Sequence, residues 1–329
     1  MPITVLKTNN PSSTLILSCV LFGLVGIFVK GINGMGTAPI LFYRLFFGFA
    51  TILTYLIAAG RFEGFHLGNK KSYLFLLGVL NTVTMFSYFS AMKYSSIPVA
   101  VLLLYTAPVY VTLLSPFLLK EKITARSMIA LTLSLAGILL TVNPGHMGIG
   151  TVASGEEGTY FLGLLFGLLS GFSFGCSILT VNHLKSDYSG TSQLLWSTLV
   201  GLLLLLPFGV SVPGEVLFEN LGRLVPLGII TTAVGTLLYM NGIVHIRAQT
   251  AAVLCLMEPV SSIFFGCTLL GDPLQANTLF GCCFILCGGL LVSLKGSIPL
   301  PGKNRLFRLS RRRRPGLFQT FMPPRPGKL

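Results

Sequence analysis

Charged side chains are scarce in this sequence of 329 residues. Asp, Glu, Lys and Arg together make up 10% of the chain, whereas hydrophobic residues make up 53% and the mean hydropathy is +0.81. Because charged residues normally form about a quarter of a globular domain, this composition excludes an ordinary soluble fold. It predicts an all-α integral membrane protein, since lipid offers no hydrogen-bond partners to backbone groups outside a helix.

The sequence also lacks the motifs of enzymes and of metal sites. It contains neither a Walker phosphate loop nor a nucleophile elbow, and its four histidines are scattered without ligand spacing. All seven cysteines lie in apolar runs, so they are interpreted as small packing residues. We therefore expect no enzymatic activity, no cofactor and no metal ion.

Long apolar runs are what the sequence does contain. Ten runs have roughly the 17 to 25 residues that a helix needs to cross the hydrocarbon core of a membrane. With a cytoplasmic N-terminus, 19 of the 23 Lys and Arg residues fall in inside segments, which the positive-inside rule favours. We expect both termini to be cytoplasmic in a multi-pass protein of the cell inner (plasma) membrane. The runs are 14–30, 38–60, 73–92, 97–119, 127–143, 161–184, 191–211, 223–242, 248–270 and 277–295.

The two halves of the chain repeat each other. Moved back by 151 positions, residues 239–272 align without a gap on residues 88–121, so that Pro259 falls on Pro108 and the acidic Asp272 on Glu121. Five helices in each copy mean that the second copy enters the membrane from the opposite side. The sequence therefore predicts two inverted five-helix repeats, residues 14–143 and 161–295, an arrangement that suits transport by alternating access.

A carboxylate lies at membrane depth in the second copy. Glu258 is about 15 Å into its predicted helix, where an ionised side chain costs roughly 2.5 to 3.5 kcal/mol. Such a residue usually serves function, here as a proton-coupling group or as a ligand for a substrate amine. The alternative is a protonated carboxyl group that only joins helices. Three further residues are candidates for binding or coupling: Arg44, Asn81 and Tyr105.

Two prolines and two tyrosines occupy equivalent positions of the copies. Pro108 and Pro259 predict a symmetric pair of kinks that open a central cavity. Tyr88 is expected near the outer end of its helix and Tyr239 near the inner end, which suits a pair of gate residues. The alternative for both tyrosines is the aromatic belt at the membrane interface.

Close helix packing is predicted by a glycine stripe at positions 163, 167, 171 and 175. It would contact another helix of the same chain or the partner in a homodimer. Glu121 and Asp272 lie at helix ends, where they suggest local structural contacts.

The last segment, 296–329, differs sharply from the rest of the chain. It contains four consecutive arginines, Arg311 to Arg314, and several prolines, so we expect a disordered basic cytoplasmic tail. A polybasic stretch beside a last helix would lie on anionic lipid headgroups. Binding to nucleic acid is not expected, because aromatic residues do not alternate with the basic ones.

These motifs together resemble one family. Residues 88–124, YFSAMKYSSIPVAVLLLYTAPVYVTLLSPFLLKEKIT, and residues 239–274, YMNGIVHIRAQTAAVLCLMEPVSSIFFGCTLLGDPL, are similar to the repeats of EamA-type ten-helix proteins in the drug/metabolite transporter (DMT) superfamily. Arg44 resembles an arginine that the family often has in its second helix. The Trp-Gly pair of the family's first helix is absent, because Phe22 and Gly23 stand there.

The resemblance implies a secondary transporter. Its expected cargo is a small polar metabolite, an amino acid or a related compound, and its expected direction is export. Coupling to protons and facilitated diffusion both stay open. A multidrug or nucleotide-sugar-type carrier is the alternative within the superfamily, and a membrane scaffold or receptor is the alternative outside transport.

Overall fold

The computed structural model describes residues 10–60, 65, 67–95, 97–142, 157–269, 271 and 275–293. Throughout these ranges the secondary structure is helical and contains no strand, as the composition predicts. The predicted tail, 296–329, and Asp272 lie outside them. In chain order the helices are α1 (Pro11–Gly23), α2 (Val25–Lys30), α3 (Thr37–Ala58), α4 (Lys71–Tyr94), α5 (Ile97–Leu104), α6 (Ala107–Leu118), α7 (Ala125–Val142), α8 (Glu157–Leu184), α9 (Gly190–Val210), α10 (Gly214–Pro226), the π-helix η3 (Leu227–Thr236), α11 (Leu237–Ile243), α12 (Ala248–Cys255), α13 (Met257–Leu269) and α14 (Ala276–Ser293).

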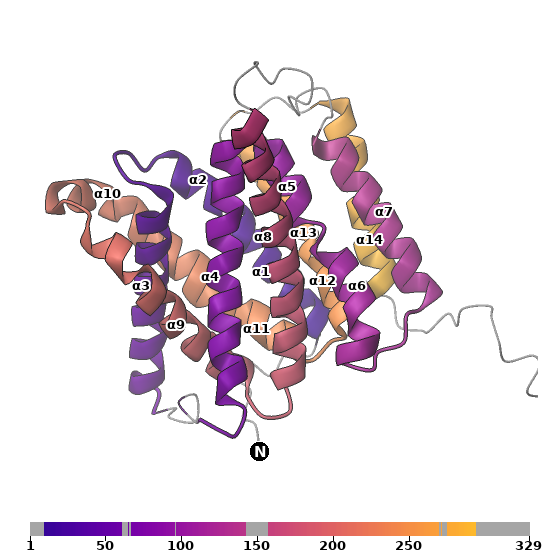
Figure 1. Cartoon of the computed structure of the whole chain (residues 1–329), viewed down its shortest axis with the longest axis horizontal. Coiled ribbons are helices and arrows are strands. Elements are labelled where there is room, and N and C mark those ends of the chain that lie inside the picture. Colours follow the sequence, from indigo (N-terminus) through magenta and orange to yellow (C-terminus); the bar gives the residue numbers. More distant parts are fainter. Residues whose placement is uncertain are drawn as a thin grey trace, which may run out of the picture.

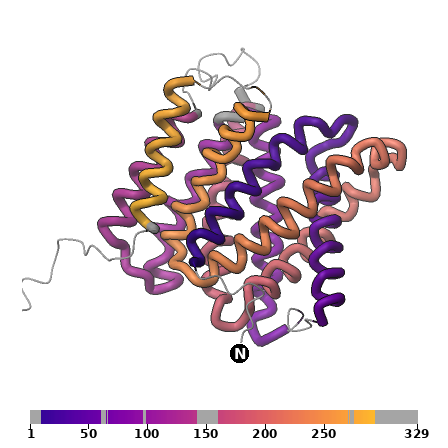
Figure 2. Tube along the Cα trace, turned by 180° about the vertical axis from the view of Figure 1, so that it is seen from behind, coloured from indigo at the N-terminus to yellow at the C-terminus, as the bar shows by residue number. Residues whose placement is uncertain are grey.

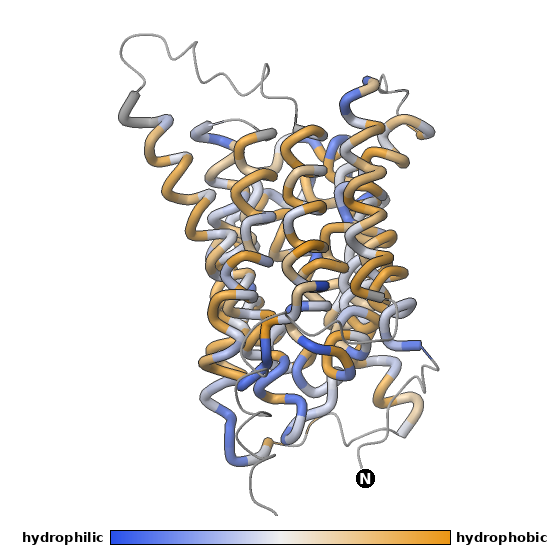
Figure 3. The backbone as a smooth tube through the Cα atoms, turned by 90° about the vertical axis from the view of Figure 1, so that its right-hand side faces the viewer, coloured by the Kyte–Doolittle hydropathy of each residue, from blue (hydrophilic) through white to orange (hydrophobic). Residues whose placement is uncertain are grey.

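Eight helical stretches within the described ranges are long and apolar enough to cross a membrane. Each overlaps one of the predicted runs, which confirms a multi-pass helical membrane protein. The fifth and tenth predicted runs correspond to shorter apolar helices, Ala125–Thr141 and Ala276–Val292. A total of ten crossings and the orientation of the termini stay predictions. Figure 3 shows hydrophobic residues along the length of the bundle and many of the hydrophilic ones towards its ends.

The helices form one bundle in which the two halves of the chain intermingle (Figure 1). α4 packs along α8 and against α9, and α3 packs against α9 and η3. α7 and α14 pair at one edge of the bundle. Seen from behind, α1 runs between helices of the second half (Figure 2), where it packs against α11 and α13.

The fourth and ninth crossings are each interrupted at equivalent points. α5 ends at Leu104 and α6 begins at Ala107, while α12 ends at Cys255 and α13 begins at Met257. Pro108 and Pro259 lie in the first turn after each interruption, and both are buried. A proline has no N–H to donate to the carbonyl four residues earlier, which here belongs to Leu104 or Cys255. The kinks predicted at these prolines therefore coincide with short interruptions, at residues 105–106 and 256, of crossings that are otherwise continuous.

The eighth crossing differs from its predicted bounds. The sequence predicts a helix over 223–242, but the structure has a continuous helical stretch from Gly214 to Ile243. A helix of this length exceeds the roughly 20 residues needed for a crossing. Its first turns carry Glu215, Glu219 and Arg223 on an amphipathic segment, so hydropathy alone does not detect them.

The glycine stripe of α8 packs against the first half of the same chain. Gly167 and Gly171 lie against Leu103 of α5, and Gly175 lies against Ala107 and Tyr110 of α6. A Cβ atom added at Gly175 would meet the Ala107 carbonyl oxygen at 3.1 Å. The intramolecular reading of the stripe is thus confirmed, and a homodimer stays a prediction without support from this surface.

Candidate functional site

Glu258 lies directly after the break in the ninth crossing. It belongs to the first turn of α13 and is half-buried. The N-terminus of a helix carries a partial positive charge, so this position favours a carboxylate. In the first half the equivalent residue is Ala107, which is fully buried at the start of α6. Only one of the two breaks therefore presents a charged side chain.

Arg44 approaches from α3. Its Nε donates a hydrogen bond of 3.0 Å to the Oγ1 of Thr231 on η3. The two helices cross with very little space between them, because Gly48 of α3 faces Gly228 of η3. A Cβ atom added at Gly228 would lie 2.6 Å from the Cβ of Phe47 and 2.9 Å from the carbonyl oxygen of Arg44. Two glycines at one crossing thus bring the Arg44 side chain onto η3.

Arg44 and Glu258 interact electrostatically although they come from opposite halves of the chain. Both side chains are half-buried. Among the described residues they do not meet in a direct ion pair. Placing the charged side chains of an arginine and a glutamate inside an apolar bundle costs free energy, and such residues commonly lie at substrate or ion pathways.

Three tyrosines complete a central cluster, which we define as Arg44, Tyr88, Tyr105, Tyr239 and Glu258. Each tyrosine lies within electrostatic range of Glu258. Tyr105 and Tyr239 are 5% and 7% exposed, and Tyr88 is half-buried. The cluster therefore draws on α3, α4, the break after α5, α11 and α13.

Tyr88 and Tyr239 occupy equivalent positions of the two halves. The sequence places Tyr88 and Tyr239 towards opposite ends of the bundle, and both interact with the carboxylate of Glu258 between them. Tyr239 also packs on Phe22 of α1, with ring centroids 6.0 Å apart. A role for these tyrosines as gates stays a prediction.

Asn81 stands apart from the central cluster. It is half-buried on α4, seven residues before Tyr88. Two helical turns place both residues on one face of α4, about 10 Å apart along its axis. Asn81 thus lies on the same face of α4 as Tyr88.

Two cysteines lie beside the cluster. Cys19 of α1 donates through its Sγ to the carbonyl oxygen of Leu254, at 3.6 Å, and it interacts with Cys255 at the end of α12. Both thiols are buried, which agrees with their interpretation as packing residues. In the described part of the chain no three His, Cys, Asp or Glu side chains are grouped in a way that could hold a metal ion.

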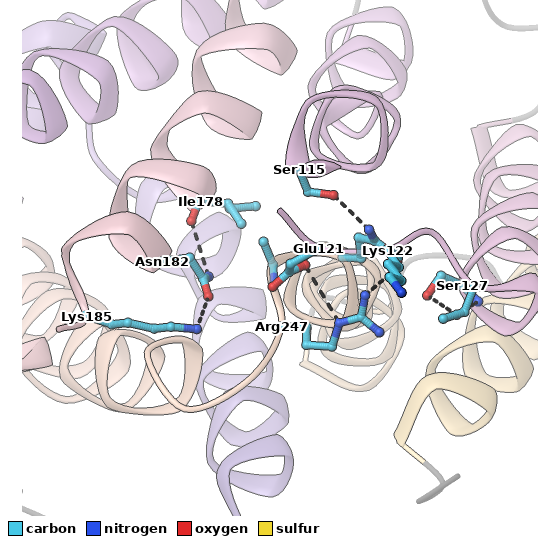
Figure 4. Close-up of polar contacts among 11 residues, drawn as sticks. Ser115, Glu121, Lys122, Ser127, Ile178, Asn182, Lys185 and Arg247 are labelled. Carbon is cyan, nitrogen blue, oxygen red and sulfur yellow. Dashed lines mark hydrogen bonds and ion pairs between the residues drawn. The ribbon is translucent and has the colours of Figure 1, made fainter. Parts of the chain in front are cut away.

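A second group of polar contacts joins the loop between α6 and α7 to the start of α12 (Figure 4). The Oε1 atom of Glu121 accepts a hydrogen bond of 3.2 Å from the backbone N–H of Ala248, and its Oε2 lies 3.9 Å from the Nε of Arg247. Arg247 also donates to the carbonyl oxygen of Lys122. We call these interactions of Glu121, Lys122, Arg247 and Ala248 the loop contact. Glu121 thus has a structural role, as expected, but its partners lie in the other half of the chain and not next to it in sequence.

Buried polar residues lie directly behind the loop contact. Gln249 donates through its Nε2 to the Oγ of Ser115 at 2.7 Å. Gln249 is 1% exposed, and Ser115 is fully buried. The loop contact and this hydrogen bond both connect the first half of the chain to the second. They close one end of the bundle between α6 and α12.

Sequence reasoning missed Thr231, Ser115 and Gln249. Threonine and serine are common in membrane helices, where their hydroxyl groups bond to the carbonyl of the preceding turn. The run 231–236, TTAVGT, contains three threonines and a glycine in an otherwise apolar helix. That local concentration is the one signal by which the π-helix could have been suspected.

Comparison with known proteins agrees with this architecture. A sequence model of the EamA-like transporter family matches residues 12–143 and 161–294. An uncharacterized transporter of Archaeoglobus fulgidus is 30% identical over 282 residues, which cover 85% of this chain and 94% of that protein. Solute carrier family 35 member G1 of Mus musculus is 29% identical over 147 residues, 44% of this chain and 39% of that protein.

The fold also has a counterpart among solved structures. One crystal structure aligns with a TM-score of 0.69 over 86% of this chain and 96% of that chain, at 17% identity. The family match spans most of both halves and confirms the resemblance drawn from the repeated motifs. The chain therefore belongs to the EamA-like transporter family of the DMT superfamily and is a multi-pass membrane transporter.

Proposed function

We propose that the protein is a secondary transporter of small zwitterionic metabolites, amino acids or close relatives, and that the central cluster is its binding site. The observation that carries the proposal is the arrangement of Arg44 and Glu258. Arg44 donates to Thr231, and among the described residues it forms no ion pair with Glu258, so the two opposite charges are not paired with each other. A solute with both an ammonium and a carboxylate group can bridge them, its amine towards Glu258 and its carboxylate towards Arg44.

The packing of the halves supports an inverted repeat of ten crossings, with domains 14–143 and 161–295. α5 and α6 pack against α8, and the equivalent α12 and α13 pack against α1. Likewise α4 packs against α9, and the equivalent η3 packs against α3. Exchange of the two halves thus preserves the neighbours of each helix. Such symmetry allows one set of contacts to close one side while its counterpart opens the other.

Direction, membrane and energy source form the rest of the proposal. We place both termini in the cytoplasm and the protein in the cell inner membrane, with net export of the cargo. Proton coupling would use Glu258, since the carboxyl group that binds the amine can release or take up a proton in each cycle. The basic tail would rest on anionic headgroups, as the positive-inside distribution of charge suggests.

Counterflow in proteoliposomes tests this proposal. The native chain, Glu258→Gln and Arg44→Gln are reconstituted and assayed with labelled L-leucine and with 3-methylbutylamine, the same compound without its carboxylate, with and without a pH gradient. We expect native exchange of L-leucine, weaker exchange of both probes with no response to the gradient in Glu258→Gln, and a selective loss of L-leucine in Arg44→Gln. No movement of L-leucine or of a wider amino-acid panel by folded native protein would reject the cargo class and favour a multidrug or nucleotide-sugar carrier.

A further inference from the structure

Thr231 is the residue of the π-helix η3 that contacts Arg44 of α3. It is fully buried, and its hydroxyl donates a hydrogen bond of 2.6 Å to the carbonyl oxygen of Leu227. A hydroxyl group has a single hydrogen to donate, so its remaining capacity is to accept. That capacity is used by the Nε–H of Arg44, at 3.0 Å. The direction of this hydrogen bond is therefore fixed, with arginine as donor and threonine as acceptor.

The π-helix keeps Thr231 in place. Thr236 donates through its Oγ1 to the carbonyl oxygen of Thr231 at 3.1 Å, five residues back, which is the spacing of a π-helix. π-Helical turns are rare and are frequently found at functional sites. The glycine crossing of Gly48 and Gly228 adds a second constraint, because it sets the distance between α3 and η3. Thr231 thus has a determined position relative to the backbone of Arg44.

Fixing the Nε–H of an arginine also fixes the plane of its guanidinium group. That group is rigid, and its other four N–H bonds lie on the two Nη atoms in the same plane. A hydrogen bond at Nε towards η3 therefore determines which direction the Nη atoms take. Without it, Arg44 would have several rotamers available, and ordering them would cost binding free energy.

We propose that Thr231 is the residue that orients Arg44, and that the π-helix serves to present the Thr231 hydroxyl as an acceptor. Thr231 does not itself touch the cargo. It holds the two Nη atoms ready for a carboxylate, and this last step rests on the proposed function. The inference makes Thr231 a determinant of the preference for cargo that carries a carboxylate.

Three substitutions test the assignment. Thr231→Val keeps the shape but removes the acceptor, and Thr231→Ser restores it. Thr232→Val is the matched control, because Thr232 is the next residue on η3, is 2% exposed and packs on Gly48. The first measurement needs no cargo: the Nε–H resonance of Arg44, identified by its absence in Arg44→Lys, is followed by NMR. We expect slow exchange with water in the native chain, Thr231→Ser and Thr232→Val, and fast exchange only in Thr231→Val.

The second measurement is counterflow of L-leucine and 3-methylbutylamine. We expect Thr231→Val to raise KM for L-leucine about tenfold, the loss of roughly one hydrogen bond to a charged group, with kcat within twofold and no change for the amine. Thr231→Ser should restore the native KM. An unchanged Arg44 resonance in Thr231→Val overturns the proposal. Equal effects on the two probes, or the same effect in Thr232→Val, also overturn it, because they indicate a structural contact only.

These outcomes separate the two proposals. If the native chain moves neither probe, the zwitterionic cargo is rejected, and the Arg44 resonance alone then decides whether Thr231 orients the guanidinium group.

Discussion

Removal of Glu121 should open the end of the bundle that the loop contact closes. Its carboxylate is 12% exposed and accepts the N–H of Ala248 at 3.2 Å. A hydrogen bond to a charged acceptor in such a position contributes about 2 kcal/mol. Arg247, whose side chain is 43% exposed, lies 3.9 Å from the same carboxylate. Exposed ion pairs contribute about 1 kcal/mol at most.

These two values predict different effects for the two partners. Glu121→Ala should raise the population of the open form about 30-fold. Arg247→Ala removes the ion pair and the exposed hydrogen bond to the Lys122 carbonyl oxygen, and should raise that population about tenfold. Thiol labelling measures that population when opening and closing are fast compared with the reaction. Ser115→Cys is the reporter, because Ser115 lies behind the loop contact and is fully buried; the substitution also weakens the hydrogen bond from Gln249, so both variants are compared with Ser115→Cys alone. A methanethiosulfonate reagent is used, and labelling of the native cysteines is subtracted.

Ser134→Cys is the matched control for this experiment. Ser134 is also a fully buried helical serine, but it belongs to α7 and packs on Gly288 of α14. Its labelling should not change in Glu121→Ala. Faster labelling at both cysteines would indicate global unfolding. Unchanged labelling at Ser115→Cys, or a larger effect of Arg247→Ala than of Glu121→Ala, would show that the Glu121 carboxylate does not hold this end closed.

The remaining predictions concern packing and pH. Gly228→Ala should lower the melting temperature and impair L-leucine exchange, since the added methyl group meets Phe47 and the Arg44 carbonyl, whereas Gly26→Ala, with nothing within 4 Å, should leave both unchanged. Gly171→Ala should lower the free energy of unfolding by about 1 to 3 kcal/mol in denaturant, because its Cβ would clash with the carbonyl oxygen of Leu103. Stability equal to that of Gly26→Ala would contradict the packing described for α8. Hydrogen bonds from Lys70, at 2.9 Å, and from Ser186 lower the pKa of Asp187 in the loop after α8. A lowered pKa gives stability that is present above the unfolded value of about 3.9 and is lost as the pH falls through the folded value. The native chain should therefore unfold at a higher temperature than Asp187→Asn at pH 7, and the difference should disappear as the pH falls well below about 3.9; a constant difference would refute this assignment.

Most of the architecture could be read from local sequence. The apolar runs located eight crossings, because a helix is the one structure that lets an isolated stretch of chain satisfy its backbone in lipid. The offset of 151 residues located both prolines and, with them, both helix breaks. Glu258 could be singled out because one carboxylate in an apolar run is conspicuous. The bounds of the eighth crossing were wrong, since its amphipathic first turns do not differ from a loop in hydropathy.

Tertiary structure decided which polar residues belong together. Arg44, Tyr88, Tyr105 and Tyr239 come from four separate stretches, and their approach to Glu258 depends on tilts and breaks that residue counting does not contain. Thr231 shows the reason most clearly. The hydroxyl group of a threonine in a membrane helix donates its hydrogen bond within that helix. The sequence around the threonine is therefore the same whether or not another helix bonds to it. The sequence by itself determined where the chain crosses the membrane and that Glu258 is an unusual charge at that depth. Only the packing of α3 against η3 decided the direction of the Arg44 side chain.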